Sequence, residues 1–85
     1  MNAPDPAPYV SVACSFYDTL EAAALHPRPL AIAYLADDGA RVDALDAVAD
    51  VFSKDGAEWL RLASGPVVRL DRLLRVGDAV PADFC

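Results

Sequence analysis

Residues 29–40, with the sequence PLAIAYLADDGA, decide the fold because they combine a strand pattern with a turn signal. In residues 29–36 large apolar side chains alternate with alanines, and a period of two is typical of a half-buried β-strand. The alternating side chains are Leu30, Ile32 and Tyr34. The Asp37-Asp38-Gly39 segment that follows is a hairpin turn signal. We therefore predict a strand over residues 29–36 and a second, antiparallel strand that begins at Ala40.

Further turn signals divide the rest of the chain into short stretches. The sequences SKDG (residues 53–56) and SGP (residues 64–66) are rich in turn-forming residues. Residues 58–63 alternate between apolar and polar side chains and are predicted to form a strand, as are residues 67–70 and 73–76. Five short antiparallel strands tend to curl into a partly open barrel, which leaves few exposed edges. We predict one helix followed by a compact antiparallel meander, an α+β fold that is mostly β.

Residues 42–52 are ambiguous, because their apolar side chains recur at helical spacing. These side chains are Val42, Leu45, Val48 and Phe52, and three aspartates lie between them on another face. Taken alone, the stretch favours a helix.

A helix is also predicted upstream, over residues 16–25. Ser15 is a typical N-cap, Asp18 suits the positive end of the helix dipole, and Pro27 ends the helix. At about 100° per residue, one face collects Phe16, Leu20, Ala23 and Ala24. The opposite side carries Tyr17, Asp18, Glu21 and Leu25. We expect the first face to be buried and the second to be exposed, either as an ordinary solvated face or as a contact patch made of a ring and two carboxylates.

The 85 residues are expected to form a single domain. Residues 1–13 contain three prolines and are predicted to be a flexible leader, in which residues 9–13 (YVSVA) can pair with a sheet edge. The folded domain is expected to span residues 14–80, with residues 81–85 as a tail. The sequence shows neither a signal-peptide pattern nor the roughly 18 apolar residues of a membrane helix, so we expect a cytoplasmic protein.

The charge is unevenly distributed along the chain, whose net charge is −6. Residues 1–50 carry eight acidic and two basic side chains, whereas residues 51–85 carry five of each. A negative field repels phosphate and attracts basic protein surfaces. Direct nucleic-acid binding usually needs a basic face. From charge alone, solubility of a small acidic protein is the simpler explanation.

No set of residues predicts catalysis or a metal site. His26, the single histidine, lies beyond the predicted helix, where a cation near the helix C-terminus is the simpler role. Cys14 could be an activated thiol at the helix start, but no histidine at a known spacing orients it, so a packed thiol is favoured. With Cys85 as the last residue, the two cysteines do not make a disulfide framework. We expect no enzymatic activity, no metal and no cofactor.

The helix start and the later strands together resemble the Rho-binding antiterminator family, called Rof. Residues 14–23, CSFYDTLEAA, match the pattern Cys, two residues, Tyr-Asp, one residue, Leu-Glu and a small residue. The resemblance continues with DG at residues 38–39, EWL at residues 58–60 and VRLD at residues 68–71. Each fragment is short, and their order along residues 14–71 carries the resemblance.

The resemblance implies an Sm-like fold, in which an N-terminal helix lies on a strongly bent five-stranded antiparallel sheet. Residues 42–52 are then expected to be an extended strand leading into an irregular turn. The resemblance also implies a bacterial, cytoplasmic regulator of transcription. Such proteins bind the N-terminal RNA-binding domain of the hexameric termination factor Rho, cover its primary RNA site and reduce Rho-dependent termination.

The same resemblance assigns the Rho contact to Tyr17, Asp18 and Glu21, whose positions match the family motif. An RNA site is basic and offers stacking surfaces, so carboxylates can replace phosphates there and a ring can replace a base. Lys54 and Asp55, in the turn before the later strands, are weaker candidates for a second rim. The expected protein is a monomer that binds neither nucleic acid directly nor a membrane.

Two other functions stay open. One is an Sm-like RNA-binding protein whose arginines line a phosphate surface, namely Arg61, Arg69, Arg72 and Arg75. Ion pairs of these arginines with Glu58, Asp71 and Asp78 explain them equally well. The other is a small acidic interaction domain with an unrelated protein partner.

Overall fold

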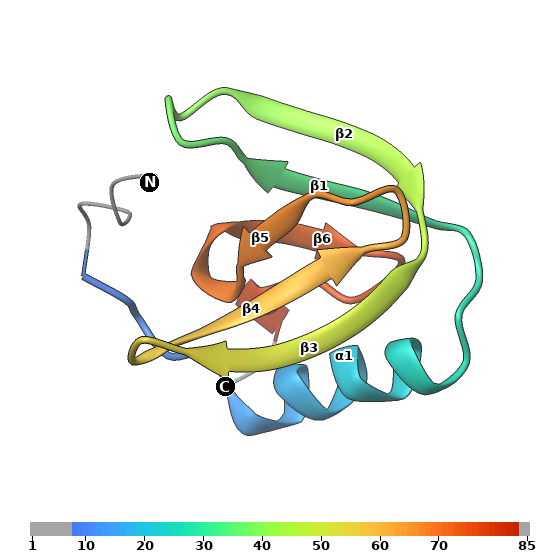
Figure 1. The fold of residues 1–85 in the computed structure, drawn as a ribbon, viewed down its shortest axis with the longest axis horizontal. Helices are drawn as coiled ribbons and strands as arrows, with labels where there is room; N and C mark the ends of the chain where they lie inside the picture. Colours follow the sequence, from blue (N-terminus) through green and yellow to red (C-terminus); the bar gives the residue numbers. More distant parts are fainter. Residues whose placement is uncertain (1–7, 84–85) are drawn as a thin grey trace.

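The computed structural model describes residues 8–83 as one α-helix, six strands and two short 3-10 helices. In chain order they are α1 (Cys14–Leu25), β1 (Leu30–Leu35), β2 (Arg41–Asp46), β3 (Val48–Lys54), β4 (Ala57–Leu62), β5 (Val67–Arg69), η1 (Leu70–Arg72), β6 (Leu73–Val76) and η2 (Pro81–Asp83). The strands form two three-stranded antiparallel sheets with the orders β2-β1-β6 and β3-β4-β5 (Figure 1). The fold is α+β and mostly strand, as predicted, and within residues 8–83 the sheets do not close into a barrel.

The β1–β2 hairpin forms where its turn signal predicted it. Gly39 has a φ of 86°, a left-handed conformation that favours glycine. Its N–H donates to the carbonyl of Ala36 at 2.8 Å. The Asp38 carboxylate accepts a hydrogen bond from the N–H of Ala40 at 2.9 Å. The second strand, β2, begins at Arg41, one residue later than predicted.

The β3–β4 hairpin turns on Asp55 and Gly56, whose φ angles are 53° and 80°. Two successive residues with positive φ are typical of a type I′ turn, which an Asp-Gly pair favours. Lys54 and Ala57 pair directly across this turn. The turn predicted for the SKDG sequence is therefore confirmed, and it fixes the register of β3 against β4.

The helix considered for residues 42–52 is wrong, because this stretch is extended. β2 pairs with β1 and β3 pairs with β4, with only Ala47 between the two strands, so the chain enters the second sheet without a loop (Figure 1). Ala47 separates the two strands, and the pairing register shifts between Val48 and Asp50. Both irregularities interrupt the alternation of side chains between the two faces of the sheet, so the apolar residues recur at a spacing that resembles a helix. Leu45, which the helix would have buried, is 77% exposed. The extended course implied by the resemblance is correct, but a strand, β3, stands in place of the irregular turn.

The chain returns to the first sheet through η1. β5 pairs with β4 in the second sheet, and β6 pairs with β1 in the first. Asp71 and Arg72, which separate the strands predicted over residues 67–70 and 73–76, lie in η1 between β5 and β6. Leu70, the first residue of η1, is fully buried, so the crossing is anchored in the core.

The start of α1 differs from the prediction. The N-cap is Ala13, which has no side-chain cap hydrogen bond, and Ser15 lies inside the helix. The N–H of Tyr17 donates to the carbonyl of Ala13 at 3.0 Å, so the first turn closes before Asp18. The N-cap role of Ser15 and the first-turn position of Asp18 are therefore wrong. A favourable position in the helix dipole does not explain Asp18.

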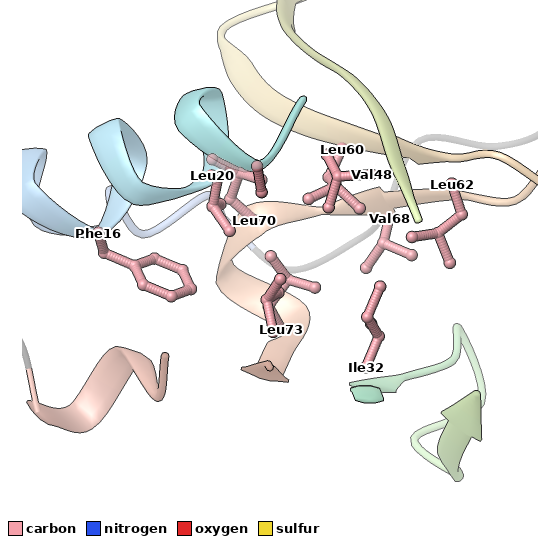
Figure 2. Packing of buried hydrophobic residues seen from close by; sticks show 11 residues of the cluster. Phe16, Leu20, Ile32, Val48, Leu60, Leu62, Val68, Leu70 and Leu73 are labelled. Carbon is pink, nitrogen blue, oxygen red and sulfur yellow. The ribbon is translucent and has the colours of Figure 1, made fainter. Parts of the chain in front are cut away.

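One hydrophobic core lies between α1 and the sheets, with α1 packed against β3. Phe16, Leu20 and Ala23 are buried and Ala24 is half-buried, so the predicted core face of the helix is confirmed. The largest fully buried side chains are Phe16, Leu20, Ile32, Val48, Leu60, Leu62 and Leu70 (Figure 2). Burying one Leu or Phe side chain stabilises a protein by about 1.5–3 kcal/mol. The core thereby fixes which face of α1 meets solvent.

The described residues at the two ends of the chain, 8–13 and 81–83, differ in structure from the prediction. Residues 8–13 form no strand, so the edge strand predicted over residues 9–13 is wrong. Tyr9 and Val12 instead pack against the core. Residues 81–83 form η2 in place of a tail. The predictions for residues 1–7 and 84–85 lie outside the described residues.

Candidate functional site

Two carboxylates, those of Asp18 and Glu21, lie on the outer face of α1. Asp18 and Glu21 are both exposed, and residues three apart are neighbours on a helix surface. Among residues 8–83, neither makes a hydrogen bond or an ion pair. Because Phe16 and Leu20 anchor the other side of α1 in the core, this side is held toward solvent. The predicted shared exposure of Asp18 and Glu21 is confirmed.

Tyr17 lies at the border between the exposed side of α1 and the core. Its side chain is half-buried and packs against the core, so its predicted place on the fully exposed side is wrong. Burial raises the pKa of the Tyr17 hydroxyl, the charges of Glu21 and Glu58 raise it further, and a hydrogen bond with Ser53 lowers it. The hydroxyl therefore lies near β3 and β4. The physical reason is the turn of about 100° per residue, which puts Tyr17 next to the buried Phe16 and not opposite it.

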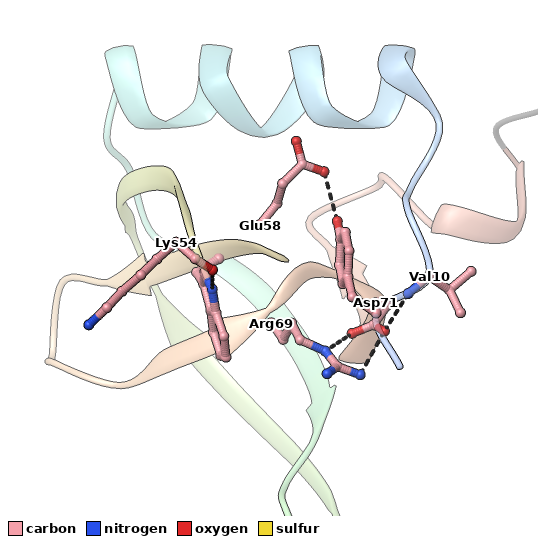
Figure 3. A network of polar contacts seen from close by, with 7 residues as sticks. Val10, Lys54, Glu58, Arg69 and Asp71 are labelled. Carbon is pink, nitrogen blue, oxygen red and sulfur yellow. Dashed lines mark hydrogen bonds and ion pairs between the residues drawn. The ribbon is translucent and has the colours of Figure 1, made fainter. Parts of the chain in front are cut away.

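Glu58 joins this region from β4. It pairs across the strands with Ser53, and strand alternation puts it on the same face as the buried Leu60 and Leu62. Figure 3 shows its carboxylate directed toward α1. Sequence reasoning used Glu58 as part of the family resemblance and as an ion-pair partner for the arginines, and missed it as a site residue. The alternation of EWLRL was the signal that could have found it.

A further acid, Asp50 of β3, adds charge to the same region, because its carboxylate also raises the pKa of Tyr17. Asp50 pairs with Arg61 at 3.8 Å, with both side chains 49% exposed. Such an exposed pair contributes at most about 1 kcal/mol. Strand alternation places Asp50 on the face of β3 opposite Ser53, away from α1, so the carboxylates beside the half-buried ring come from α1 and β4. The acidic face is defined as Tyr17, Asp18, Glu21 and Glu58.

The hairpin candidates Lys54 and Asp55 are both exposed at the β3–β4 turn. Ser53, the preceding residue, contacts Tyr17, so the hairpin backbone begins beside the acidic face. The Trp59 indole N–H donates to the Lys54 carbonyl at 3.1 Å and holds the turn. Strand alternation directs the Lys54 side chain away from α1, as Figure 3 shows. The structure thus brings Tyr17, Asp18 and Glu21 together, but the Lys54 side chain does not join them.

A second polar arrangement, the N-terminal clasp, consists of Tyr9, Val10, Glu58, Arg69 and Asp71 (Figure 3). Arg69 Nε and Nη2 donate to the two carboxylate oxygens of Asp71 at 2.6 and 2.8 Å. These side chains are only 6% and 11% exposed. The Val10 N–H donates to Asp71 Oδ2 at 3.0 Å, and the Arg69 guanidinium lies 5.7 Å from the centre of the Tyr9 ring. The Tyr9 hydroxyl donates to Glu58 Oε1 at 2.7 Å, which links the clasp to the acidic face.

The clasp changes the interpretation of the arginines considered for RNA binding. Arg69 is buried and bound to Asp71, as the ion-pair explanation expected. Arg61 pairs with Asp50 and not with Glu58. Arg75 is exposed on β6, in the other sheet. These arginines therefore do not line a single phosphate-binding surface.

The remaining polar groups were predicted neither to bind a metal nor to lie in a membrane. Among residues 8–83, no group of three or more His, Cys, Asp or Glu side chains could hold a metal ion. The same residues contain no helix long and apolar enough to cross a membrane. Cys14 is exposed, so its predicted packed position is wrong. His26 is exposed and caps the end of α1 through its backbone N–H, which donates to Ala22.

A scan of the sequence against protein-family models finds no match, and a search of curated proteins finds none either. The acidic face is the feature of the described residues whose chemistry points to a function. Its exposed carboxylates can bind cationic groups, and its half-buried ring can pack against an aromatic or guanidinium plane.

Proposed function

We propose that this protein inhibits the bacterial transcription termination factor Rho by binding its N-terminal RNA-binding domain through the acidic face. By covering the primary RNA site, it reduces Rho-dependent termination and acts as an antiterminator. The observation that carries the proposal is the pair Asp18 and Glu21, exposed and unpaired among residues 8–83, beside the ring of Tyr17. The family resemblance assigns the partner contact to these same positions.

The chemistry of the expected partner site supports the proposal. A site that grips RNA presents basic groups and surfaces on which bases stack. Asp18 and Glu21 can stand in for phosphates, and Tyr17 can offer part of its ring in place of a base. Glu58 extends the negative charge onto the second sheet. Lys54 and Asp55 remain secondary candidates, because the hairpin residue that bonds to Tyr17 is Ser53, the residue before them.

The strand arrangement supports an Sm-like fold as part of the same proposal. Counting β2 and β3 as one strand bent at Ala47 leaves five strands after α1. With that count, the two three-stranded sheets would join in the order β6, β1, bent strand, β4 and β5, which is compatible with a single strongly bent sheet. This is the sheet that the resemblance implies.

As proposed, the protein regulates Rho only by binding to it. Such regulation needs no catalysis and no cofactor from this chain, and it places the protein in the bacterial cytoplasm, where Rho acts. A monomer suffices, because the acidic face is built from one chain.

The first test is a pull-down from bacterial lysate with the tagged protein, followed by calorimetry with the purified N-terminal domain of Rho. Rho should be the main protein retained, and binding should weaken as salt rises because the contact acts through charge. The matched control is Asp78→Lys, which reverses an exposed acid outside the acidic face and should bind like the wild type. Retention of a different protein, with no measurable binding to the Rho domain, would show that the acidic face serves an unrelated partner.

A further inference from the structure

Glu58 is the residue that the acidic face and the N-terminal clasp share. Its carboxylate accepts a hydrogen bond from the Tyr9 hydroxyl at 2.7 Å, and its charge acts on Tyr17. Tyr9 and Glu58 are 49 residues apart in the chain. The position of one acid beside Tyr17 therefore depends on a segment that precedes α1.

Tyr9 is itself held on two sides. Its ring lies under the guanidinium of Arg69, and the adjacent Val10 N–H donates to Asp71. Arg69 and Asp71 are buried and bound to each other through two hydrogen bonds. A rigid ion pair thus fixes the ring, and the ring fixes the direction of its hydroxyl.

The Tyr9 hydroxyl is a permanent donor at any physiological pH. Burial raises the pKa of Tyr9 far above its ordinary value, and the hydrogen bond and charge of Glu58 raise it further. The Tyr9 phenol therefore keeps its proton and donates it in a hydrogen bond to Glu58 Oε1. The other carboxylate oxygen of Glu58 has no such bond to Tyr9.

We propose that Tyr9 is a positioning residue for the acidic face, whose hydroxyl holds Glu58 beside Tyr17 so that a basic partner meets a fixed carboxylate. The inference rests on the proposed function, because it takes the partner to be the basic RNA site of Rho. Glutamate has several freely rotating bonds, and ordering such a side chain on binding weakens an interface. Holding Glu58 in advance removes this cost, which corresponds to about a 2- to 10-fold gain in affinity.

The test compares Tyr9→Phe with the wild type. This substitution removes one hydroxyl and keeps the ring under the Arg69 guanidinium. The control is Tyr34→Phe, because Tyr34 is also half-buried and its hydroxyl makes no hydrogen bond among residues 8–83. Thermal denaturation of both variants confirms that they fold.

The first readout uses the free protein, so it does not depend on Rho. In NMR spectra, Tyr9→Phe should shift the side-chain signals of Glu58 and the ring signals of Tyr17, whereas Tyr34→Phe should leave them in place. Unchanged Glu58 and Tyr17 signals in folded Tyr9→Phe would overturn the positioning role, whatever the partner is.

The second readout is the affinity for the Rho N-terminal domain, measured as a double-mutant cycle with Glu58→Gln. Tyr9→Phe should weaken binding by about 2- to 10-fold, and the loss should disappear when Glu58 is already Gln. A purely structural role for Tyr9 would give the same loss in both backgrounds, and that result, or equal affinity of Tyr9→Phe and wild type, overturns the inference. Failure of the wild type itself to bind would contradict the proposed function, while the NMR readout would still decide the positioning role.

Discussion

Asp71 and Asp18 show two opposite uses of the same side chain. Asp71 is 11% exposed, and its carboxylate accepts hydrogen bonds from Arg69 and from the Val10 N–H. Asp18 is exposed and, within residues 8–83, makes no hydrogen bond or ion pair. The first charge is satisfied inside the protein, so it belongs to the fold. The second is free for a partner, so stability and binding should separate between these two positions.

The pair Arg41 and Asp43 shows that sequence spacing alone does not decide this difference. Like Arg69 and Asp71, these residues are two apart and joined by two hydrogen bonds, both at 3.0 Å. Their side chains are 57% and 66% exposed, however, so water already solvates both charges. Burial, and not the Arg-x-Asp pattern, makes the Asp71 pair part of the core.

The largest effect is expected for Asp71→Ala. The substitution removes the carboxylate that accepts two hydrogen bonds from the buried Arg69. Removing one partner of a buried ion pair costs about 3–5 kcal/mol of unfolding free energy. Chemical denaturation of the variant measures this loss. If unfolding free energy changed by less than about 1 kcal/mol, as for an exposed pair, the clasp would not be a structural element.

Asp18→Lys should have the next largest effect, on binding only. A charge reversal in a desolvated contact with basic groups weakens binding by about 2–5 kcal/mol. Calorimetry with the Rho N-terminal domain measures the affinity. The melting temperature should barely move, because Asp18 lies beyond the first turn of α1 and makes no bond to the rest of the described chain. A large drop in melting temperature would mean that Asp18 belongs to the fold, like Asp71.

High pH should weaken the fold through Tyr9. Its pKa in the folded protein is raised above the ordinary 10.0, first by burial and then by Glu58. Above about pH 10 the unfolded chain loses this proton while the folded protein keeps it, so stability is intact below that pH and falls as pH rises. The fall is at most about 1.4 kcal/mol of unfolding free energy per pH unit. Denaturation at several alkaline pH values should show a shallower fall for Tyr9→Phe, and identical slopes would contradict this cause.

The smallest effect is expected for Asp43→Asn. The substitution breaks an ion pair between exposed side chains, and such pairs contribute little because water competes for both partners. Melting curves of the variant and the wild type should nearly coincide. A shift as large as that of Asp71→Ala would remove the distinction between the two pairs.

Local signals in the sequence were enough to predict the hairpins and the core face of α1. The Asp-Gly turns need positive φ angles that few other residues adopt, and both occur where they were predicted. The helical period placed Phe16 and Leu20 in the core. These features depend on neighbours within a few residues, so the sequence displays them directly.

Features set by distant contacts could not be predicted in this way. The clasp joins Val10 to Asp71, 61 residues away, and no local pattern announces such a contact. The break at Ala47 and the nearby register shift gave residues 42–52 a false helical period. Ser15 looks like an N-cap, yet α1 begins before it. Glu58 reaches the acidic face only because β4 pairs with β3, which packs against α1.

The central claim is that the acidic face competes with RNA for Rho, and RNA loading onto the full Rho hexamer tests it most directly. A labelled RNA that binds the primary site is titrated with Rho in the presence of wild-type protein, Asp18→Lys or the control Asp78→Lys. The wild type and Asp78→Lys should displace the RNA in a dose-dependent, salt-sensitive manner, whereas Asp18→Lys should leave it bound. Undiminished RNA binding at saturating wild-type protein, or equal displacement by Asp18→Lys, would contradict the account.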